Sequence, residues 1–381
     1  MRFSFPTADP MDGLTALRRE VGEFLSEARS AGAFTPRCSG WMAFDADFSR
    51  SCGERGYIGM TWPRRYGGQE RSAIERYVVV EEMLAAGAPV GAHWIADRQS
   101  GPQILNNGSE ELKRELLPRI ARGEVFFAIG MSEPDAGSDL SSIRSRARKT
   151  EGGWRLDGRK IWMTNGHRAH YLIGLFRTGP AEAGSRHAGM TQFIVDLSAP
   201  GIERRPIEDM IGEKDFTEVV LDEVFVPDHY VLGMPGDGWR LVMAELAYER
   251  SGPERFLSVF PLLNEAVDLL RGSATEVERR GIGRIVAHLA TLREMSISIA
   301  ARLARGELPS TEAALVKDLG NALEREIPEV LRGFARQPPR HGGDDYSQRL
   351  GDAILAAPSF TLRGGTPEIL RGIIARELGL R

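Results

Sequence analysis

The loop of residues 129–139, IGMSEPDAGSD, gathers the polar groups with the clearest potential for chemistry in this sequence. Ser132, Ser138 and Asp139 stand in a glycine-containing turn, where hydroxyls and backbone N–H groups can face one ligand. Such a loop can bind an anion or a polar heterocycle. Serine, aspartate and glycine are also the ordinary residues of turns that bind nothing. The residue types alone leave both interpretations open.

Other familiar site chemistries lack their residues. The seven histidines are scattered, and neither they nor Cys38 and Cys52 form a set with the spacing of a metal site. Two cysteines are also too few for a disulfide framework. We find no G-x-S-x-G motif, no Walker A motif and no G-x-G-x-x-G nucleotide loop in its proper context. We therefore expect no metal ion and no rival catalytic mechanism.

The elements before this loop have helical periodicity. Apolar residues recur at helical spacing over residues 14–27, 75–86 and 110–120. Ser109 stands just before the last of these segments, and Glu110 and Glu111 follow it, as expected of a helix N-cap with acidic residues in the first turn. The first third of the chain is therefore predicted to be helical.

From about residue 127 the apolar period shortens to two. Short runs rich in β-branched and aromatic residues predict strands over residues 154–164, 170–178, 190–197 and 217–227. Asp157-Gly158, between two such runs, is a hairpin signal. We expect this middle block to form an antiparallel sheet.

After Gly233 the helical period returns. It predicts helices over residues 238–249, 258–270, 282–305 and 312–331. The fold class is therefore α+β and mainly α. We expect an N-terminal helical domain over residues 1–126, a β-sheet domain over 127–232 and a C-terminal four-helix bundle over 233–381.

Composition limits the possible partners and location. The chain has 381 residues, 42% of them hydrophobic and 27% charged, and its net charge is −4. That balance is ordinary for a globular protein, and it excludes a chain-wide basic surface for nucleic acid or an anionic membrane. The N-terminus lacks the apolar core of a signal peptide, and no run approaches about 20 apolar residues. We expect a cytoplasmic protein that binds neither nucleic acid nor membrane.

Several segments, taken together, resemble one family. The loop of residues 129–139, followed by WRLDGRKIWMTNG (154–166), is similar to the flavin-binding stretch of the acyl-CoA dehydrogenase family. LRGGTPEILRGIIARELG (362–379) resembles the closing motif of that family. The segments at 108–124 and 236–251 resemble two further family segments, and all follow the family's order.

The resemblance implies FAD as cofactor. The loop would run along the flavin, with Ser132 and nearby backbone groups bonding the ring edge, and Trp162, Met163 and Thr164 would cover the other face and bond it near N5. Trp162 could equally be a buried strand aromatic. The implied cofactor-binding residues are Ile129, Met131, Ser132, Gly137, Ser138, Trp162, Met163, Thr164, Arg279, Thr366 and Glu368.

The resemblance also implies removal of two hydrogens from adjacent carbons of an acyl-CoA thioester, giving a 2-enoyl-CoA. A carboxylate takes the α-proton while the β-hydrogen leaves as hydride to flavin N5. The implied substrate-binding residues are Ser138, Arg240, Arg250, Gly364 and Gly365.

The catalytic carboxylate has two possible places in the family. Many members carry it immediately before the Gly-Thr of the closing motif, where this chain has Gly364. Another branch, with isovaleryl- and long-chain-type enzymes, places it on a helix just before an arginine, and this chain has Glu249-Arg250 there. We therefore predict Glu249 as the base, with the backbone N–H of Gly364 as an oxyanion donor. Glu245, one turn earlier on the same helix face, is the rival.

Two departures concern the elements that complete a neighbouring subunit's flavin site in the family. An Arg-x-x-Phe-Gly stretch with a later glutamine is replaced by Arg279, Ile282, Gly283 and Ala290. A Gly-Gly-x-Gly-Tyr loop is replaced by RQPPRHGGDDY at 336–346. The chain could bind FAD through other groups, pair with a different subunit that supplies the contacts, or serve as a non-catalytic partner.

These possibilities set the expected partners. We expect an acyl-CoA substrate and an electron-transfer flavoprotein as acceptor. The assembly would be a homodimer, a homotetramer or a hetero-oligomer with a related subunit. A carrier-protein thioester is an alternative substrate.

Overall fold

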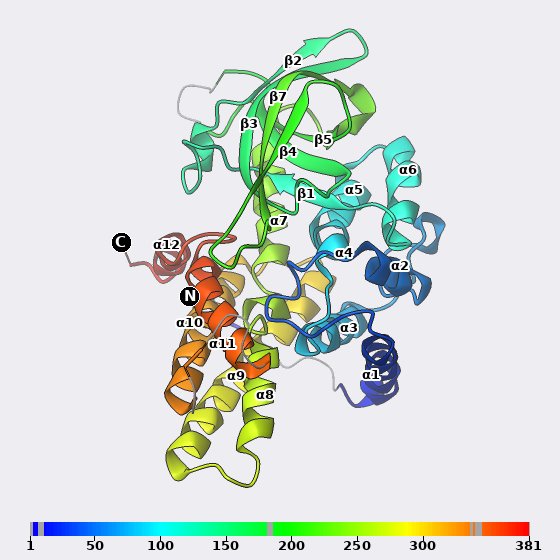
Figure 1. Ribbon diagram of the computed structural model, residues 1–381. Helices are drawn as coiled ribbons and strands as arrows, with labels where there is room; N and C mark the ends of the chain where they lie inside the picture. Colours follow the sequence, from blue (N-terminus) through cyan, green and yellow to red (C-terminus); the bar gives the residue numbers. More distant parts are fainter. Residues whose placement is uncertain (1–2, 7–10, 181–185, 336–337, 340–344, 381) are drawn as a thin grey trace. The chain divides into compact units, whose positions relative to one another are not determined.

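The computed structural model describes residues 3–6, 11–180, 186–335, 338–339 and 345–380 (Figure 1). The side chains of residues 11, 12 and 246–249 lie outside this description. The chain forms two compact units. The first comprises Met1–Trp41, Ser72–Pro89 and Ala247–Arg381, and the second comprises Met42–Arg71 and Val90–Leu246.

The first unit is built from helices. In chain order they are η1 (Met11–Leu14), α1 (Thr15–Ser30), α3 (Ala73–Ala85), η6 (Pro253–Arg255), α8 (Phe260–Leu270), α9 (Glu276–Ala304), α10 (Ser310–Phe334), α11 (Asp345–Ala356), η7 (Ala357–Thr361) and α12 (Pro367–Glu377). Capping boxes begin α3 at Ser72 and α9 at Thr275, where side chain and backbone satisfy each other's hydrogen bonds. These helices confirm the periodicity predicted for this part of the sequence.

A buried carboxylate joins three helices of this unit. Glu81 of α3 accepts from Arg18 of α1 at 2.6 Å and from Arg293 of α9, also at 2.6 Å. Only 9% of the Glu81 side chain is exposed, so these ion pairs are partly shielded from solvent. They fix the register of α1 and α9 on α3.

The second unit combines short helices with one sheet. Its helices are α2 (Ala46–Glu54), η2 (Arg64–Tyr66), α4 (Gly91–Ile95), the π-helical turn η3 (Ala96–Ser100), α5 (Gly101–Asn107), α6 (Glu110–Ala121), η4 (Leu140–Ser142), η5 (Asp228–Tyr230) and the greater part of α7 (Gly238–Glu249). Its strands are β1 (Phe127–Gly130), β2 (Arg146–Thr150), β3 (Gly153–Thr164), β4 (Tyr171–Arg177), β5 (Met190–Asp196), β6 (Ile202–Ile207), β7 (Phe216–Pro227) and β8 (Val231–Leu232). Ser109 caps α6 by accepting from the N–H of Leu112, as predicted.

The sheet order is β6-β7-β3-β2-β4-β5-β8, with β1 paired to β4. Most pairs are antiparallel, as predicted, but β1 and β2 each run parallel to β4. Because β1 runs parallel to β4, the 129–139 loop that follows β1 does not connect these two strands as a hairpin. The core beneath contains the side chains Trp154, Leu156, Leu172, Phe176, Phe193, Val195, Val219, Leu221 and Val224.

The hairpin prediction at Asp157-Gly158 is wrong. β3 runs through both residues, and the register with β7 shifts between Leu156 and Gly158, which marks a β-bulge. Gly158 has a φ of 148°, and a Cβ there would lie 2.2 Å from the Ser145 hydroxyl oxygen. Glycine is therefore required for close strand approach and not for a turn.

Candidate functional site

Two segments of the predicted flavin site meet in the second unit. The N–H of Ile161 in β3 donates to the carbonyl oxygen of Ser132 at 3.0 Å. The Nζ of Lys160 donates to the carbonyl oxygen of Met131 at 3.2 Å. The loop after β1 is thereby bonded directly to the part of β3 that carries Trp162. Tertiary structure brings together two segments that lie some thirty residues apart in sequence.

An ion pair beneath this junction holds the loop. Lys160 Nζ lies 2.8 Å from Glu133 Oε1, with 0% and 8% of the two side chains exposed. Glu133 also accepts the backbone N–H groups of Arg144 at 2.7 Å and Ser145 at 3.0 Å. Each carboxylate oxygen therefore receives at least one donor. This pairing lets two charged groups remain buried.

The titration of this pair follows from its surroundings. Burial by itself raises the pKa of Glu133. The charge and hydrogen bond of Lys160, together with the donors at Arg144 and Ser145, lower the pKa by more than burial raises it, so the pKa lies below its usual range. Burial lowers the pKa of Lys160 to about 8, although Glu133 opposes that shift. The charged pair is the form we expect at neutral pH.

Trp162 is held outward by a second irregularity in β3. The register with β7 shifts again between Lys160 and Met163, and Trp162 has a φ of 62°, in the left-handed region. That conformation is strained for a bulky side chain, and such strain gathers at functional sites. The indole is 58% exposed and contacts only the edge of Phe216 among the described aromatic rings, with 6.0 Å between centroids. It is not the buried strand aromatic of the alternative interpretation.

The other residues predicted here take different environments. Met163 is fully buried in the sheet core, and Met131 packs against a cluster with Ala136, Leu175 and Val242. Both side chains therefore pack against buried residues next to the loop and β3. Ile129, Ser132 and Thr164 are half-buried.

Gly137 and Ser138 lie on an exposed turn. Glu133 and Ala136 exchange two backbone hydrogen bonds of 2.9 and 3.0 Å, which close this turn. Asp139, at its end, accepts from Ser141 at 2.6 Å and from Arg186 at 2.8 Å, and these two donors lower its pKa. Ser138 remains accessible.

Sequence reasoning missed a buried polar cluster around Glu245. Gln99 of η3 donates its amide to Glu245 Oε1 at 2.8 Å, and Gln192 of β5 donates to Oε2 at 3.4 Å. Arg98 donates to the carbonyl oxygen of the Gln99 side chain at 2.7 Å. A π-helical turn often marks a functional site, and here it aims consecutive polar side chains into the interior. No motif in the sequence announces it.

In the first unit, the closing motif forms a turn held by two cations. Gly364 and Gly365 have φ values of 65° and 105°, which only glycine adopts readily. Arg250 Nε donates to the Gly364 carbonyl oxygen at 3.1 Å, and Lys317 Nζ donates to the Gly365 carbonyl oxygen at 2.9 Å. Both cations are buried. Sequence reasoning also missed Lys317, although it falls in helical phase with the buried Ala313 and Asn321.

Arg363, just before the turn, is anchored as well. Its Nη2 donates to Glu324 at 2.9 Å and to the Ser258 hydroxyl at 3.1 Å, and its guanidinium lies 4.4 Å from the ring centre of Trp41. Complete burial raises the pKa of Glu324 despite the opposing charge of Arg363.

The remaining predicted residues lie at the edges of these groups. Arg240 is exposed and pairs with Asp237 at 2.9 Å. Thr366 occupies the N-cap position of α12 without a side-chain cap hydrogen bond, and Glu368 is exposed, with a pKa lowered by its own N–H and the Thr366 hydroxyl. Arg279 lies in the first turn of α9. Glu249 ends α7, but its side chain lies outside the described residues.

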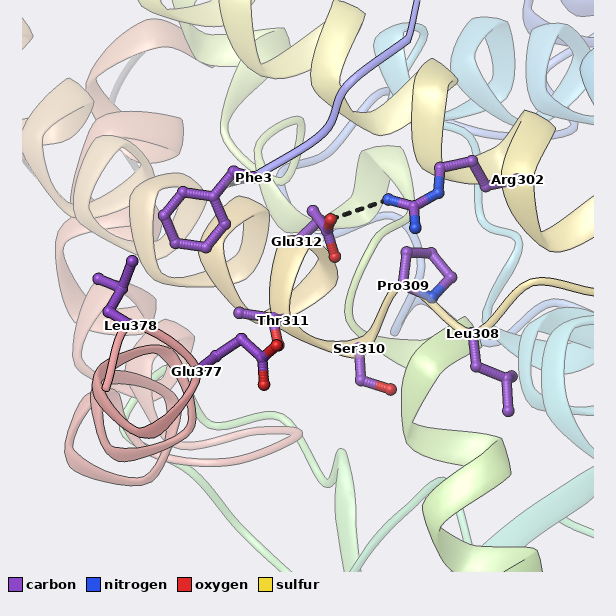
Figure 2. Close-up of a pocket in the computed structure, with 9 residues that line it drawn as sticks. All are labelled: Phe3, Arg302, Leu308, Pro309, Ser310, Thr311, Glu312, Glu377 and Leu378. Carbon is purple, nitrogen blue, oxygen red and sulfur yellow. Dashed lines mark hydrogen bonds and ion pairs between the residues drawn. The ribbon is translucent and has the colours of Figure 1, made fainter. Parts of the chain in front are cut away.

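A separate pocket of about 370 Å³ lies in the helical unit, beside the α9–α10 connection and the end of α12 (Figure 2). The nine lining residues drawn there include none of the predicted site residues. An ion pair between Arg302 and Glu312 at 2.9 Å crosses one wall.

Family models match most of the N-terminal and middle parts of the chain. The acyl-CoA dehydrogenase N-terminal domain matches residues 12–124, and the acyl-CoA dehydrogenase middle domain matches residues 128–224. The acyl-CoA dehydrogenase IpdE1 of Mycobacterium tuberculosis is 32% identical over 333 residues, which cover 84% of this chain and 83% of that protein. The chain belongs to the acyl-CoA dehydrogenase family.

Other relatives agree. The acyl-CoA dehydrogenase FadE34 of Mycobacterium tuberculosis is 32% identical over 330 residues, 85% of this chain, although the chain spans only 45% of that longer protein. The solved structure described as the Tcur3481-Tcur3483 steroid ACAD has a TM-score of 0.85 and 27% identity, covering 98% of this chain and 99% of its own. The ChsE4-ChsE5 complex from Mycobacterium tuberculosis has a TM-score of 0.82 and 28% identity over 100% of this chain and 99% of that one.

Family membership confirms three predictions. The helix, sheet, helix fold is that of acyl-CoA dehydrogenases, the class of enzyme is an oxidoreductase, and the family's cofactor is FAD. In the described part of the chain no helix is both long and apolar enough to cross a membrane.

Proposed function

We propose that this chain catalyses FAD-dependent α,β-dehydrogenation of an acyl-CoA thioester to a 2-enoyl-CoA. The observation that carries the proposal is the junction at which the 131–133 loop is hydrogen-bonded to β3. Directly beside these bonds in β3, Trp162 is exposed and has a strained, left-handed backbone conformation. Membership of the acyl-CoA dehydrogenase family supports it.

The residues at this junction suit a flat heterocycle with polar edges. The exposed indole of Trp162 offers a stacking face, and the half-buried Ser132 and Thr164 carry hydroxyl groups. When bound, FAD supplies the two-electron acceptor for the β-hydrogen. The buried Lys160–Glu133 pair keeps the loop in place, so the donors need no rearrangement on binding.

Glu249 removes the α-proton in this proposal. A thioester α-proton is a far weaker acid than a carboxylic acid, so the developing negative charge needs stabilisation at the thioester oxygen. The backbone N–H of Gly364 donates to that oxygen. A desolvated site raises the pKa of the carboxylate and makes it a better base.

The acyl group is expected to be branched or bulky. Gly364 places no side chain where many members carry their catalytic acid. Relatives include an isovaleryl-CoA dehydrogenase of Solanum tuberosum, 29% identical over 377 residues, and the structure described as a steroid ACAD, at 27% identity. We expect a cytoplasmic enzyme with an electron-transfer flavoprotein as its acceptor.

A second candidate is a subunit of a hetero-oligomeric acyl-CoA dehydrogenase. Ile282 and Ala290 stand where the family pattern has Phe and Gln, so this chain contributes little to a neighbour's flavin. Two similar structures are described as two-protein assemblies, ChsE4-ChsE5 and Tcur3481-Tcur3483.

One experiment separates the candidates. The chain is purified alone, its visible spectrum is recorded, and flavin released by heat is counted per chain. We expect about one FAD per chain, bleached by a branched or bulky acyl-CoA from a panel of thioesters. No flavin, even after FAD is added, would contradict the first candidate and favour the hetero-oligomer, and flavin that no acyl-CoA reduces would contradict the dehydrogenase activity itself.

A further inference from the structure

We propose that Arg250 and Lys317 are positioning residues that hold the Gly364–Gly365 turn so that its backbone N–H groups face the thioester. This inference rests on the proposed function, because it concerns the oxyanion donor of that reaction. In this proposal Arg250 acts by holding the backbone of the turn and not by contacting the substrate. It adds Lys317, which no motif identified.

The turn needs anchors because its residues are glycines. Gly364 and Gly365 both have positive φ, and glycine visits many other conformations at little cost. Replacing the acid of other family members by Gly364 therefore leaves a more flexible backbone at the reacting carbonyl. An oxyanion donor is effective only when it is aimed in advance.

The anchors act on two consecutive carbonyl groups. Arg250 Nε donates to the Gly364 oxygen at 3.1 Å, and Lys317 Nζ donates to the Gly365 oxygen at 2.9 Å. In a trans peptide the C=O and the following N–H point in opposite directions. Because Arg250 holds the Gly364 oxygen, the N–H of Gly365 points away from Arg250. In the same way, because Lys317 holds the Gly365 oxygen, the N–H of Thr366 points away from Lys317.

The Lys317 anchor is itself fixed by its surroundings. The Lys317 side chain is fully buried, and the Asn321 amide, oriented to satisfy both neighbours, accepts from Lys317 Nζ at 2.9 Å and donates to the Phe360 carbonyl oxygen at 2.8 Å. Upstream, Arg363 is bonded to Glu324 at 2.9 Å. Arg363 supplies the carbonyl of the peptide that carries the Gly364 N–H, so the residues on both sides of this donor are anchored, Arg363 through its side chain and Gly364 through its carbonyl oxygen.

Within the described part of the chain, the N–H groups of Gly364, Gly365 and Thr366 show no hydrogen bond to a protein acceptor. The carbonyl oxygens of Gly364 and Gly365 are both bonded, while these N–H groups stay available. This is the pattern of a preorganised donor site.

The test replaces Lys317 by methionine, which keeps the length of the side chain but removes the ammonium group. Lys317→Gln is a second variant, in case the first folds poorly. Arg371→Gln is the matched control, because Arg371 joins α12 to Asp318 of α10 at 3.1 Å without contacting the turn. Flavin content and thermal unfolding are measured for all forms.

Two readouts follow. The first is the rate of flavin reduction at saturating acyl-CoA, in the presence of bound FAD. The second is the infrared stretching frequency of the thioester carbonyl of a bound, isotope-labelled 2-enoyl-CoA, which falls when the oxygen accepts strong hydrogen bonds. A loss of stability alone does not move this frequency.

We expect Lys317→Met to slow flavin reduction by about tenfold to a hundredfold with little change in KM. The bound carbonyl frequency should shift back toward its value in water, whereas Arg371→Gln should leave both readouts unchanged. An unshifted carbonyl in folded Lys317 variants would overturn the positioning role while leaving the proposed function intact. A wild-type enzyme that reduces no flavin with any acyl-CoA would instead overturn the proposed function.

Discussion

Two buried lysines, Lys160 and Lys317, carry out similar tasks at the scale of single residues. Both side chains are fully buried, and each donates to a backbone carbonyl oxygen of a predicted site segment, Met131 in one unit and Gly365 in the other. A buried ammonium group costs much free energy unless it is bonded, and both lysines meet this requirement through the backbone carbonyl oxygens that they hold.

At the same scale, Glu249→Gln tests the proposed base. Glutamine has almost the same shape but cannot accept the α-proton. We expect flavin to remain bound, and the rate of its reduction by acyl-CoA to fall by about 10³-fold. Stopped-flow absorbance of the flavin measures this rate.

Glu245→Gln is the matched control on the same face of α7. Its carboxylate accepts from Gln99 and Gln192, so the change should lower thermal stability more than it lowers the reduction rate. The opposite result, with reduction lost only in Glu245→Gln, would transfer the role of base to Glu245.

At the scale of elements, the ion pair of Glu133 and Lys160 bonds the loop after β1 to β3. The pKa of Glu133 is lower in the folded protein than its ordinary value of 4.5, so the folded state favours the ionised form. This stability is present above pH 4.5 and is lost as the pH falls through the lower folded value. In Glu133→Gln the free energy of unfolding should therefore decrease less steeply below pH 4.5 than it does in the wild-type protein.

At neutral pH, Glu133→Gln should also lower the free energy of unfolding by about 3 kcal/mol, because it leaves Lys160 buried without its ion pair. Asp139→Asn, in the same loop, removes an exposed pair with Arg186 and should lower the free energy of unfolding far less. Denaturant titrations between pH 3 and 7 measure both. Equal effects of the two substitutions would show that burial of the pair has no special role.

The bulge in β3 allows a test that separates strain from binding. Trp162→Gly relieves a left-handed conformation but removes a stacking surface. We expect the free energy of unfolding to change by no more than about 1 kcal/mol, since relief of strain offsets the flexibility of glycine. The Kd for FAD should rise about tenfold, as expected for loss of one aromatic contact. Titration of flavin-free protein checks this, and an unchanged Kd would exclude Trp162 from the flavin site.

At the scale of the whole molecule, the predicted site residues are divided between two compact units. The flavin-side residues 129–164 belong to the second unit, while Arg250, Arg279 and the closing motif belong to the first. Helix α7 passes from one unit into the other and carries Glu245 and Glu249. The count of FAD per chain therefore tests the complete assembly, including any contribution from a second subunit.

The sequence by itself determined the family, the order of helical and sheet regions and most elements, because amphipathic periods and motifs are local properties of the chain. Only the tertiary structure revealed the bulge that exposes Trp162, the strand that runs through Asp157-Gly158, and the burial of Lys160 and Lys317. Each depends on partners distant in sequence: β7 for the bulges, Glu133 for Lys160 and the closing turn for Lys317. A local pattern cannot specify which distant carbonyl or carboxylate will satisfy a buried charge, and that pairing organises the candidate site.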